Sequence, residues 1–262
     1  MRAEVTLLDL RLRRRSLLGY TAGMALYTLV VVALYPQFKN SVSLDQLTRH
    51  GSAVAALFGA TGTLTSPAGW LSANIYANFL PLIMLLITIG YGAACIAGQD
   101  EEGTLSLTAA LPLTRTSILV QKTASLVVQA IVLGVVTMIC VAVGRGSGLN
   151  ITPADLAGIT IAITLAGIDF GLLALSIGCL TGSRGTAIGI TAAVAAASYL
   201  ISSLAPVIHW LRPARYASLL YWSVGGNQLT SGISVSSAVV LAAAGAALLA
   251  VAWYGFRRLD LH

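Results

Sequence analysis

The chain has 262 residues, of which 57% are hydrophobic and only 9% are charged, and its formal net charge is +6. Soluble domains carry about 25% charged residues, and no soluble fold of this length can bury so large a share of apolar side chains. The composition therefore excludes a soluble protein and indicates an all-α integral membrane protein, because the alternation typical of a membrane barrel is missing.

Residues 1–16 combine five arginines with several leucines ahead of the first apolar stretch. No small-residue cleavage site follows, so we expect that stretch to be retained and not removed as a signal peptide. The segment fits two interpretations. It is either a helix that lies along the inner headgroups or a basic signal that only fixes the orientation of the first span.

Six stretches are long enough to cross a hydrocarbon core, which needs about 20 apolar residues. With the N-terminus inside, the cytoplasmic segments hold ten of the 15 Lys and Arg residues and the outer segments hold five. The positive-inside rule therefore predicts six transmembrane helices with both termini in the cytoplasm. The predicted spans are 17–35, 71–98, 117–143, 156–181, 185–208 and 237–256.

Several amide and charged side chains fall inside these spans. Asn74 and Asn78 are four residues apart, so we expect both amides on one face of span 2, toward another helix or the translocation path. Lys122 lies near the inner surface, where its ammonium group can reach water. Asp169 lies at mid-span, where a carboxylate costs about 2.5–3.5 kcal/mol, so we expect it inside the bundle, bonded to Gln129 or a backbone carbonyl, or protonated. A proton relay is the alternative, although such relays usually contain several acids.

Small residues recur at four-residue spacing along the last three spans. The pairs Gly178/Gly182 and Gly185/Gly189, and the Ala-rich run around Gly245, permit close helix packing within the subunit or between subunits.

The stretch after span 2 reads QDEEGTLSLTAALPLTRTSILVQK and places three of the nine acidic residues side by side. Asp100 is a suitable N-cap for a helix over 101–111. Glu101 and Glu102 then fall in its first turn, where the helix dipole favours negative charge. Pro112 ends that helix.

Thr114 or Thr116 can cap the start of span 3, so residues 99–116 form a short cytoplasmic loop. Two interpretations of this loop remain open. It is either an acid-tipped helix that faces a partner protein or an ordinary capped connection.

The chain lacks the usual motifs of catalysis and nucleotide binding. No G-x-x-x-x-G-K-[ST], H-E-x-x-H or G-x-S-x-G is present, and the three cysteines fall inside spans without a metal-like spacing. We therefore expect no catalytic residue, metal or cofactor on this chain. The classes of function that remain are transport, a channel and an anchoring role.

The loop sequence resembles the signature between the second and third spans of ABC-2-type transporter permeases, which reads roughly E-E-G-T-hydrophobic, then L-P-hydrophobic-[ST]-R. The six spans and the chain length agree with that family, and "LRPARYASLLYWSVGGNQLTSG" is a weaker second match. The positions that carry the signature are Glu101, Glu102, Gly103, Thr104, Leu105, Leu111, Pro112 and Arg115.

This resemblance implies a single permease domain over residues 1–262 with the type V exporter-like fold, and an outer loop or re-entrant hairpin at 209–236. In such exporters residues 99–116, including Asp100, seat in a cleft of a partner ATPase. The resemblance further implies two separate ATPase subunits that bind ATP and Mg, and a second permease copy or a homologous permease. Spans 1 and 5 commonly meet across that dimer, which favours Gly185 and Gly189 for the contact.

The expected function is thus the membrane subunit of an ATP-driven exporter in a bacterial plasma membrane, with no role for nucleic acid. An interior with few charges suits a hydrophobic or amphipathic substrate such as a drug, an antibiotic or a lipid. A self-sufficient secondary transporter or channel is the alternative, and it would show internal repeats and paired ionisable groups. A membrane anchor or an enzyme of another class is the third hypothesis.

Overall fold

The computed structural model describes residues 4–39, 65–104, 114–205, 208, 213–225, 229, 232 and 234–258. All regular secondary structure in these residues is helical, and six helical segments are long and apolar enough to cross a membrane. The six predicted spans are therefore confirmed as helices. Their bounds are Val5–Phe38, Pro67–Glu101, Arg115–Gly146, Pro153–Thr181, Arg184–Leu204 and Val235–Arg258.

The first helix, α1, runs without interruption over Glu4–Phe38, so the arginine-rich segment and the first span are one helix. Its first turns pack on α8 (Arg115–Val143), where the backbone N–H of Val5 donates to Gln121 Oε1 at 2.9 Å. The hydroxyl of Thr6 also donates to the carbonyl of Gln121, at 3.0 Å. These contacts hold the N-terminal segment against the first turns of α8.

The second span is not one regular helix. It consists of α4 (Pro67–Leu71), a π-helical turn η1 (Ser72–Tyr76), α5 (Phe79–Ala93), a second π-helical turn η2 (Ala94–Gly98) and the short α6 (Gln99–Glu101). Such π-turns are rare and are frequently found at functional sites. The break between η1 and α5 coincides with a proline in the first turn of α5, which has no N–H to continue an upstream helix.

Hydroxyl side chains start the next helices. The 3₁₀ turn η3 (Gly144–Ser147) extends α8, and then α9 (Pro153–Thr181) and α10 (Arg184–Leu204) follow. Each cap accepts a hydrogen bond from a backbone N–H two or three residues into its helix, which satisfies one of the orphan donors there. The caps are Thr114 for α8, Thr152 for α9 and Ser183 for α10.

After α10 the described chain forms the 3₁₀ turn η5 (Pro213–Ala217), the short helix α11 (Leu219–Val224) and α13 (Val235–Arg258). Helix α11 packs back against α9, α10 and α13. The predicted outer loop or hairpin at 209–236 lies partly outside the described residues.

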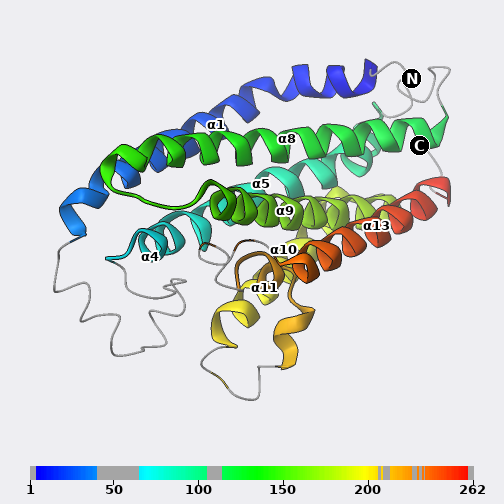
Figure 1. Ribbon diagram of the computed structural model, residues 1–262. Helices are drawn as coiled ribbons and strands as arrows, with labels where there is room; N and C mark the ends of the chain where they lie inside the picture. Colours follow the sequence, from blue (N-terminus) through cyan, green and yellow to red (C-terminus); the bar gives the residue numbers. More distant parts are fainter. Residues whose placement is uncertain are drawn as a thin grey trace.

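Helix α9 is the centre of the bundle, because α5, α8, α10, α11 and α13 all pack against it (Figure 1). Its glycines allow this close approach. A Cβ on Gly92 of α5 would overlap the carbonyl oxygen of Gly171, and a Cβ on Gly167 would overlap the side chain of Met84. Helices α10 and α13 are largely exposed on the sides that face away from the bundle.

Candidate functional site

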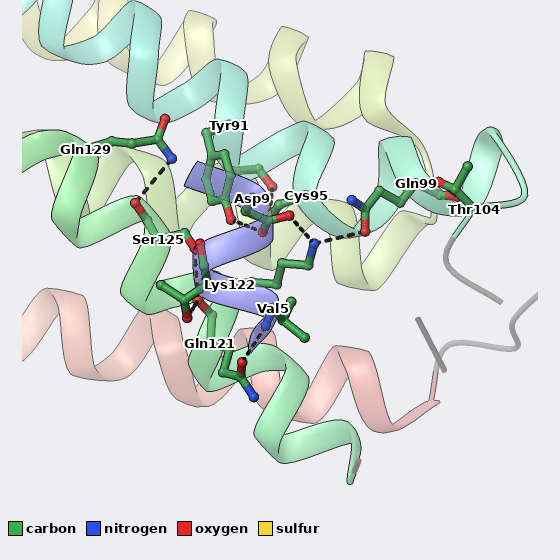
Figure 2. Close-up of polar contacts among 12 residues, drawn as sticks. Val5, Asp9, Tyr91, Cys95, Gln99, Thr104, Gln121, Lys122, Ser125 and Gln129 are labelled. Carbon is green, nitrogen blue, oxygen red and sulfur yellow. Dashed lines mark hydrogen bonds and ion pairs between the residues drawn. The ribbon is translucent and has the colours of Figure 1, made fainter. Parts of the chain in front are cut away.

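Four polar side chains form a buried cluster at the end of the bundle where span 2 leads into the loop. We call Asp9, Tyr91, Gln99 and Lys122 the inner polar cluster (Figure 2). The Lys122 ammonium lies 2.9 Å from Asp9 Oδ1 and 3.0 Å from Gln99 Oε1, and the Tyr91 hydroxyl donates to Asp9 Oδ2 at 2.6 Å. The cluster therefore joins α1, α5, α6 and α8 at one point.

The exposed fractions of the Lys122 and Asp9 side chains are 1% and 7%. The expectation that the Lys122 ammonium reaches water is therefore wrong. A buried ion pair is stable only when its partners satisfy each other, and both oxygens of Asp9 have a donor here. The Arg13 guanidinium also lies 4.9 Å from the centroid of the Tyr91 ring. The sequence offered one signal for this cluster, an aspartate among arginines in the first helix.

The E-E-G-T sequence ends span 2, and it does not begin a new helix. Gly103 has a φ of +68°, in the left-handed region that glycine adopts without strain. Its N–H donates to the carbonyl of Asp100 at 2.9 Å, and the N–H of Thr104 donates to the carbonyl of Gln99 at 2.9 Å. This pair of bonds is a Schellman motif, which terminates a helix.

The predicted N-terminus of a helix over 101–111 is therefore wrong. Asp100 is not an N-cap but a helical residue of α6, and Glu101 and Glu102 lie at the C-terminal end of span 2. A helix C-terminus disfavours negative charge. The predicted site residues Leu105, Leu111 and Pro112 lie outside the described residues.

Two charged side chains, one near each end of the loop, contact the ends of other helices. Glu101 Oε1 accepts a hydrogen bond from the backbone N–H of Arg184, the first residue of α10, at 2.8 Å. Arg115 Nη1 donates to the carbonyls of Phe256 and Arg257 at the C-terminus of α13, at 3.1 and 3.4 Å. Each charge therefore has the sign that the contacted helix end favours. Asp100 is buried, and its Oδ1 has no hydrogen-bond partner among the described residues.

A second feature is a cavity of about 350 Å³ between α5, α10 and α11, which we call the lateral cavity. Its walls are apolar except at one place, where the Tyr199 hydroxyl donates to Asn78 Oδ1 at 2.7 Å. Phe79 and Leu82 are exposed, so the cavity borders the face of the bundle that lipid would cover. The lining residues are Asn78, Phe79, Pro81, Leu82, Leu85, Ala195, Ala196, Tyr199 and Leu220.

The expectation that Asn74 and Asn78 share one helix face does not hold, because η1 and the break after it separate them. Asn74 Nδ2 donates to the carbonyl of Trp70 at 2.9 Å, while the carbonyl of Asn74 accepts from the Tyr27 hydroxyl of α1. Asn78 instead bonds Tyr199 of α10. Of the two amides, only that of Asn78 borders the lateral cavity.

Asp169 and Gln129 are both buried, as expected, but Gln129, one of the alternatives predicted as partner of Asp169, does not bond it. Gln129 Nε2 donates to the carbonyl of Ser125, one turn earlier in α8. Asp169 instead faces α13, where its Oδ1 lies 2.7 Å from the position that a Cβ on Gly245 would take. Among the described residues its Oδ2 has no hydrogen-bond partner.

The small residues divide into two groups. Gly178 is buried, and a Cβ there would lie 3.2 Å from Ala97 Cβ; Gly182 adopts φ +65° and caps α9. A Cβ on Gly185 or Gly189 would meet nothing within 4 Å, so this face of α10 is open. Its use as a dimer contact stays a prediction.

No group of three or more His, Cys, Asp or Glu side chains that could hold a metal ion occurs within the described part of the chain. A family model for ABC-2 family transporter proteins matches residues 4–261, nearly the whole sequence. No curated protein matches the chain.

Proposed function

The chain belongs to the ABC-2 family of transporter proteins, and from this premise we propose that it is the permease subunit of an ATP-driven exporter in a bacterial plasma membrane. The family places it as a multi-pass membrane transport subunit of an ABC transporter that has no catalytic role of its own. The direction of transport, the substrate and the partner ATPase are parts of the proposal.

We propose that residues 99–116 contact one of two ATPase subunits in the complex, and that these subunits bind the ATP and Mg that this chain has no motif to hold. The architecture of the loop supports this role. Its first residues end span 2 in a Schellman motif, and its last residue before α8 is the Thr114 cap. The loop ends are thereby fixed to rigid helices, so a force applied to the loop reaches the bundle directly.

The lateral cavity is the observation that carries the proposed substrate class. Its volume lies at the lower end of the 300–1,000 Å³ range typical of small-molecule sites. The walls are alanine, leucine, proline and phenylalanine side chains, with one amide–hydroxyl pair. Such a site favours an apolar or amphipathic molecule that can exchange one hydrogen bond with Asn78 or Tyr199, and it offers no charge to a polyanion.

Purification from native membranes tests the ATPase partnership. We expect the tagged chain to bring down a protein with a phosphate-binding loop, and the separated chain to show no ATP turnover. Gly103→Asn tests the loop contact, because asparagine tolerates a positive φ while it adds bulk to an exposed position. This variant should keep its fold and lose ATPase association. ATP turnover by the chain alone, or unchanged association of Gly103→Asn, would contradict the coupling proposal.

Filling the cavity tests the substrate class. Ala196→Trp places an indole in the lateral cavity, whereas Ala193→Trp adds the same side chain to an exposed position of α10 outside it. Stimulation of the partner ATPase by a panel of amphipathic dyes should fall in the first variant and persist in the control. Equal stimulation in both variants, or stimulation of the wild type by anionic oligosaccharides alone, would contradict the assignment.

A further inference from the structure

Glu101 stands at a position where its own helix disfavours it. It is the last residue of α6, at the C-terminal end of span 2, where the aligned peptide dipoles leave partial negative charge. Glu101 Oε1 instead accepts the N–H of Arg184, one of the orphan donors at the N-terminus of α10. This contact joins residues 83 positions apart, from the second and fifth spans.

The same end of α10 is closely fitted to span 2. A Cβ on Gly98 would lie 3.2 Å from Arg184 Cδ. The Ser183 side chain accepts a hydrogen bond from the backbone N–H of Thr186, and Glu101 accepts one from the backbone N–H of Arg184. Two different donors in the first turn of α10 are therefore satisfied. The N-terminus of α10 is thus capped by Ser183, which directly precedes it, and by Glu101 at the end of span 2.

Helix α10 then rises to form a wall of the lateral cavity with Ala195, Ala196 and Tyr199. At that level Tyr199 bonds Asn78, so span 2 and α10 are joined at two points, one beside the loop and one at the cavity. Ala187 and Ala195 also pack in an apolar cluster with residues of α5 and α9, and most of the remaining surface of α10 is exposed. The exposed side leaves α10 room to tilt about these contacts.

We propose that Glu101 is a positioning residue that attaches the end of span 2, where the loop begins, to α10, so that displacement of this end tilts α10 and changes the width of the lateral cavity. The inference rests on the proposed function for the use of this motion, but the attachment itself is a property of the chain alone. The attachment is a hydrogen bond from the backbone of α10 to a side-chain oxygen of residue 101. It therefore depends on an acceptor at residue 101 and not on the identity of the side chain at 184.

The test compares three variants of the full chain in nanodiscs, without ATPase. Glu101→Ala removes the acceptor, Glu101→Gln retains an acceptor oxygen, and Glu102→Ala removes the neighbouring, exposed acid as a matched control. Hydrogen exchange of the first turn of α10 should become about five-fold faster in Glu101→Ala, as for loss of a helix cap, and stay near wild type in the other two.

Local exchange alone would also respond to a purely structural cap, so a second readout reports on the far end of the helix. With Cys95, Cys140 and Cys179 replaced, spin labels at Val143 of α8 and Leu200 of α10 occupy exposed positions at the end of the bundle opposite the loop. Dilution with unlabelled chain removes distances between subunits. Glu101→Ala should broaden the distance distribution, and Glu101→Gln should restore it.

An unchanged distribution in Glu101→Ala would overturn the proposal, and so would equal broadening in Glu102→Ala, because the loss of any acid would then suffice. Trapping the complex with ATPase, ATP and vanadate adds the functional step: the wild-type distance should shift and the Glu101→Ala distance should not. If the wild type binds no ATPase, the proposed function fails, while the measurement on the chain alone still decides the attachment.

Discussion

At the scale of single residues, three of the charged side chains near the loop are matched to helix ends or to a buried partner of opposite charge. Glu101 lies at the N-terminus of α10, Arg115 lies at the C-terminus of α13, and Lys122 is buried against Asp9. A lone charge in any of these places would be costly, because little water is available to solvate the buried pair and the helix ends carry partial charge of fixed sign. The pairing therefore fixes which segments meet.

The ion pair of the inner polar cluster gives a prediction at this scale. Lys122→Met leaves the Asp9 carboxylate buried without its cation and should destabilise the fold by about 3–5 kcal/mol. Asp9→Asn combined with Lys122→Met removes both charges and should recover much of that loss, although Tyr91 keeps an acceptor. Thermal unfolding of the single and double variants in nanodiscs measures the coupling. Additive losses in the double variant would show that the two side chains do not interact.

At the scale of helices, side chains of minimal size decide how closely the spans pack. Helix α5 meets α9 where Gly92 faces Gly171, and the backbones there are too close for any Cβ. Without a hydrophobic driving force between helices in lipid, such close van der Waals contact is a main source of association. One π-turn precedes α5 and another follows it.

Gly92→Ala tests this helix contact, with Gly90→Ala as its control. The new methyl group at 92 would overlap a backbone oxygen, which cannot rotate away, so we expect a loss of about 1–3 kcal/mol from overpacking. A Cβ on Gly90, two residues earlier in the same helix, meets nothing within 4 Å. Alanine there should leave the unfolding temperature unchanged or raise it slightly. Equal behaviour of the two variants would contradict the close α5–α9 packing.

At the scale of the whole molecule, the beginning of α1 and the end of α13 lie at the same end of the bundle (Figure 1). The contacts agree with this arrangement. Val5 of α1 bonds Gln121 near the start of α8, and Arg115, the first residue of α8, bonds the carbonyl of Phe256 near the end of α13. Six crossings return the chain to the side on which it started. Which side that is follows only from the distribution of Lys and Arg, which predicts the cytoplasm.

Cysteine labelling in whole cells tests this orientation. In a background without Cys95, Cys140 and Cys179, Glu102→Cys should react with a membrane-impermeant maleimide only after the membrane is opened. Asn150→Cys, exposed at the other end of the bundle, should react in intact cells. The reverse pattern would place both termini outside and would remove the loop from the compartment that holds ATP.

The sequence by itself determined the all-helical membrane class, the six spans and the family, because hydropathy and the E-E-G-T and L-P signature are local properties of the chain. It also determined that Asp169 and Gln129 are buried, since lipid disfavours both. Only the tertiary structure decided which groups meet: Asp169 with Gly245, Lys122 with Asp9, Asn78 with Tyr199 and Glu101 with Arg184. Pairings between distant segments depend on how helices turn and tilt against each other, and spacing along one helix does not encode this. The acids of the loop show the difference most clearly, because the same three residues fit the start of a new helix or the end of the old one, and only the left-handed turn at Gly103 distinguishes the two.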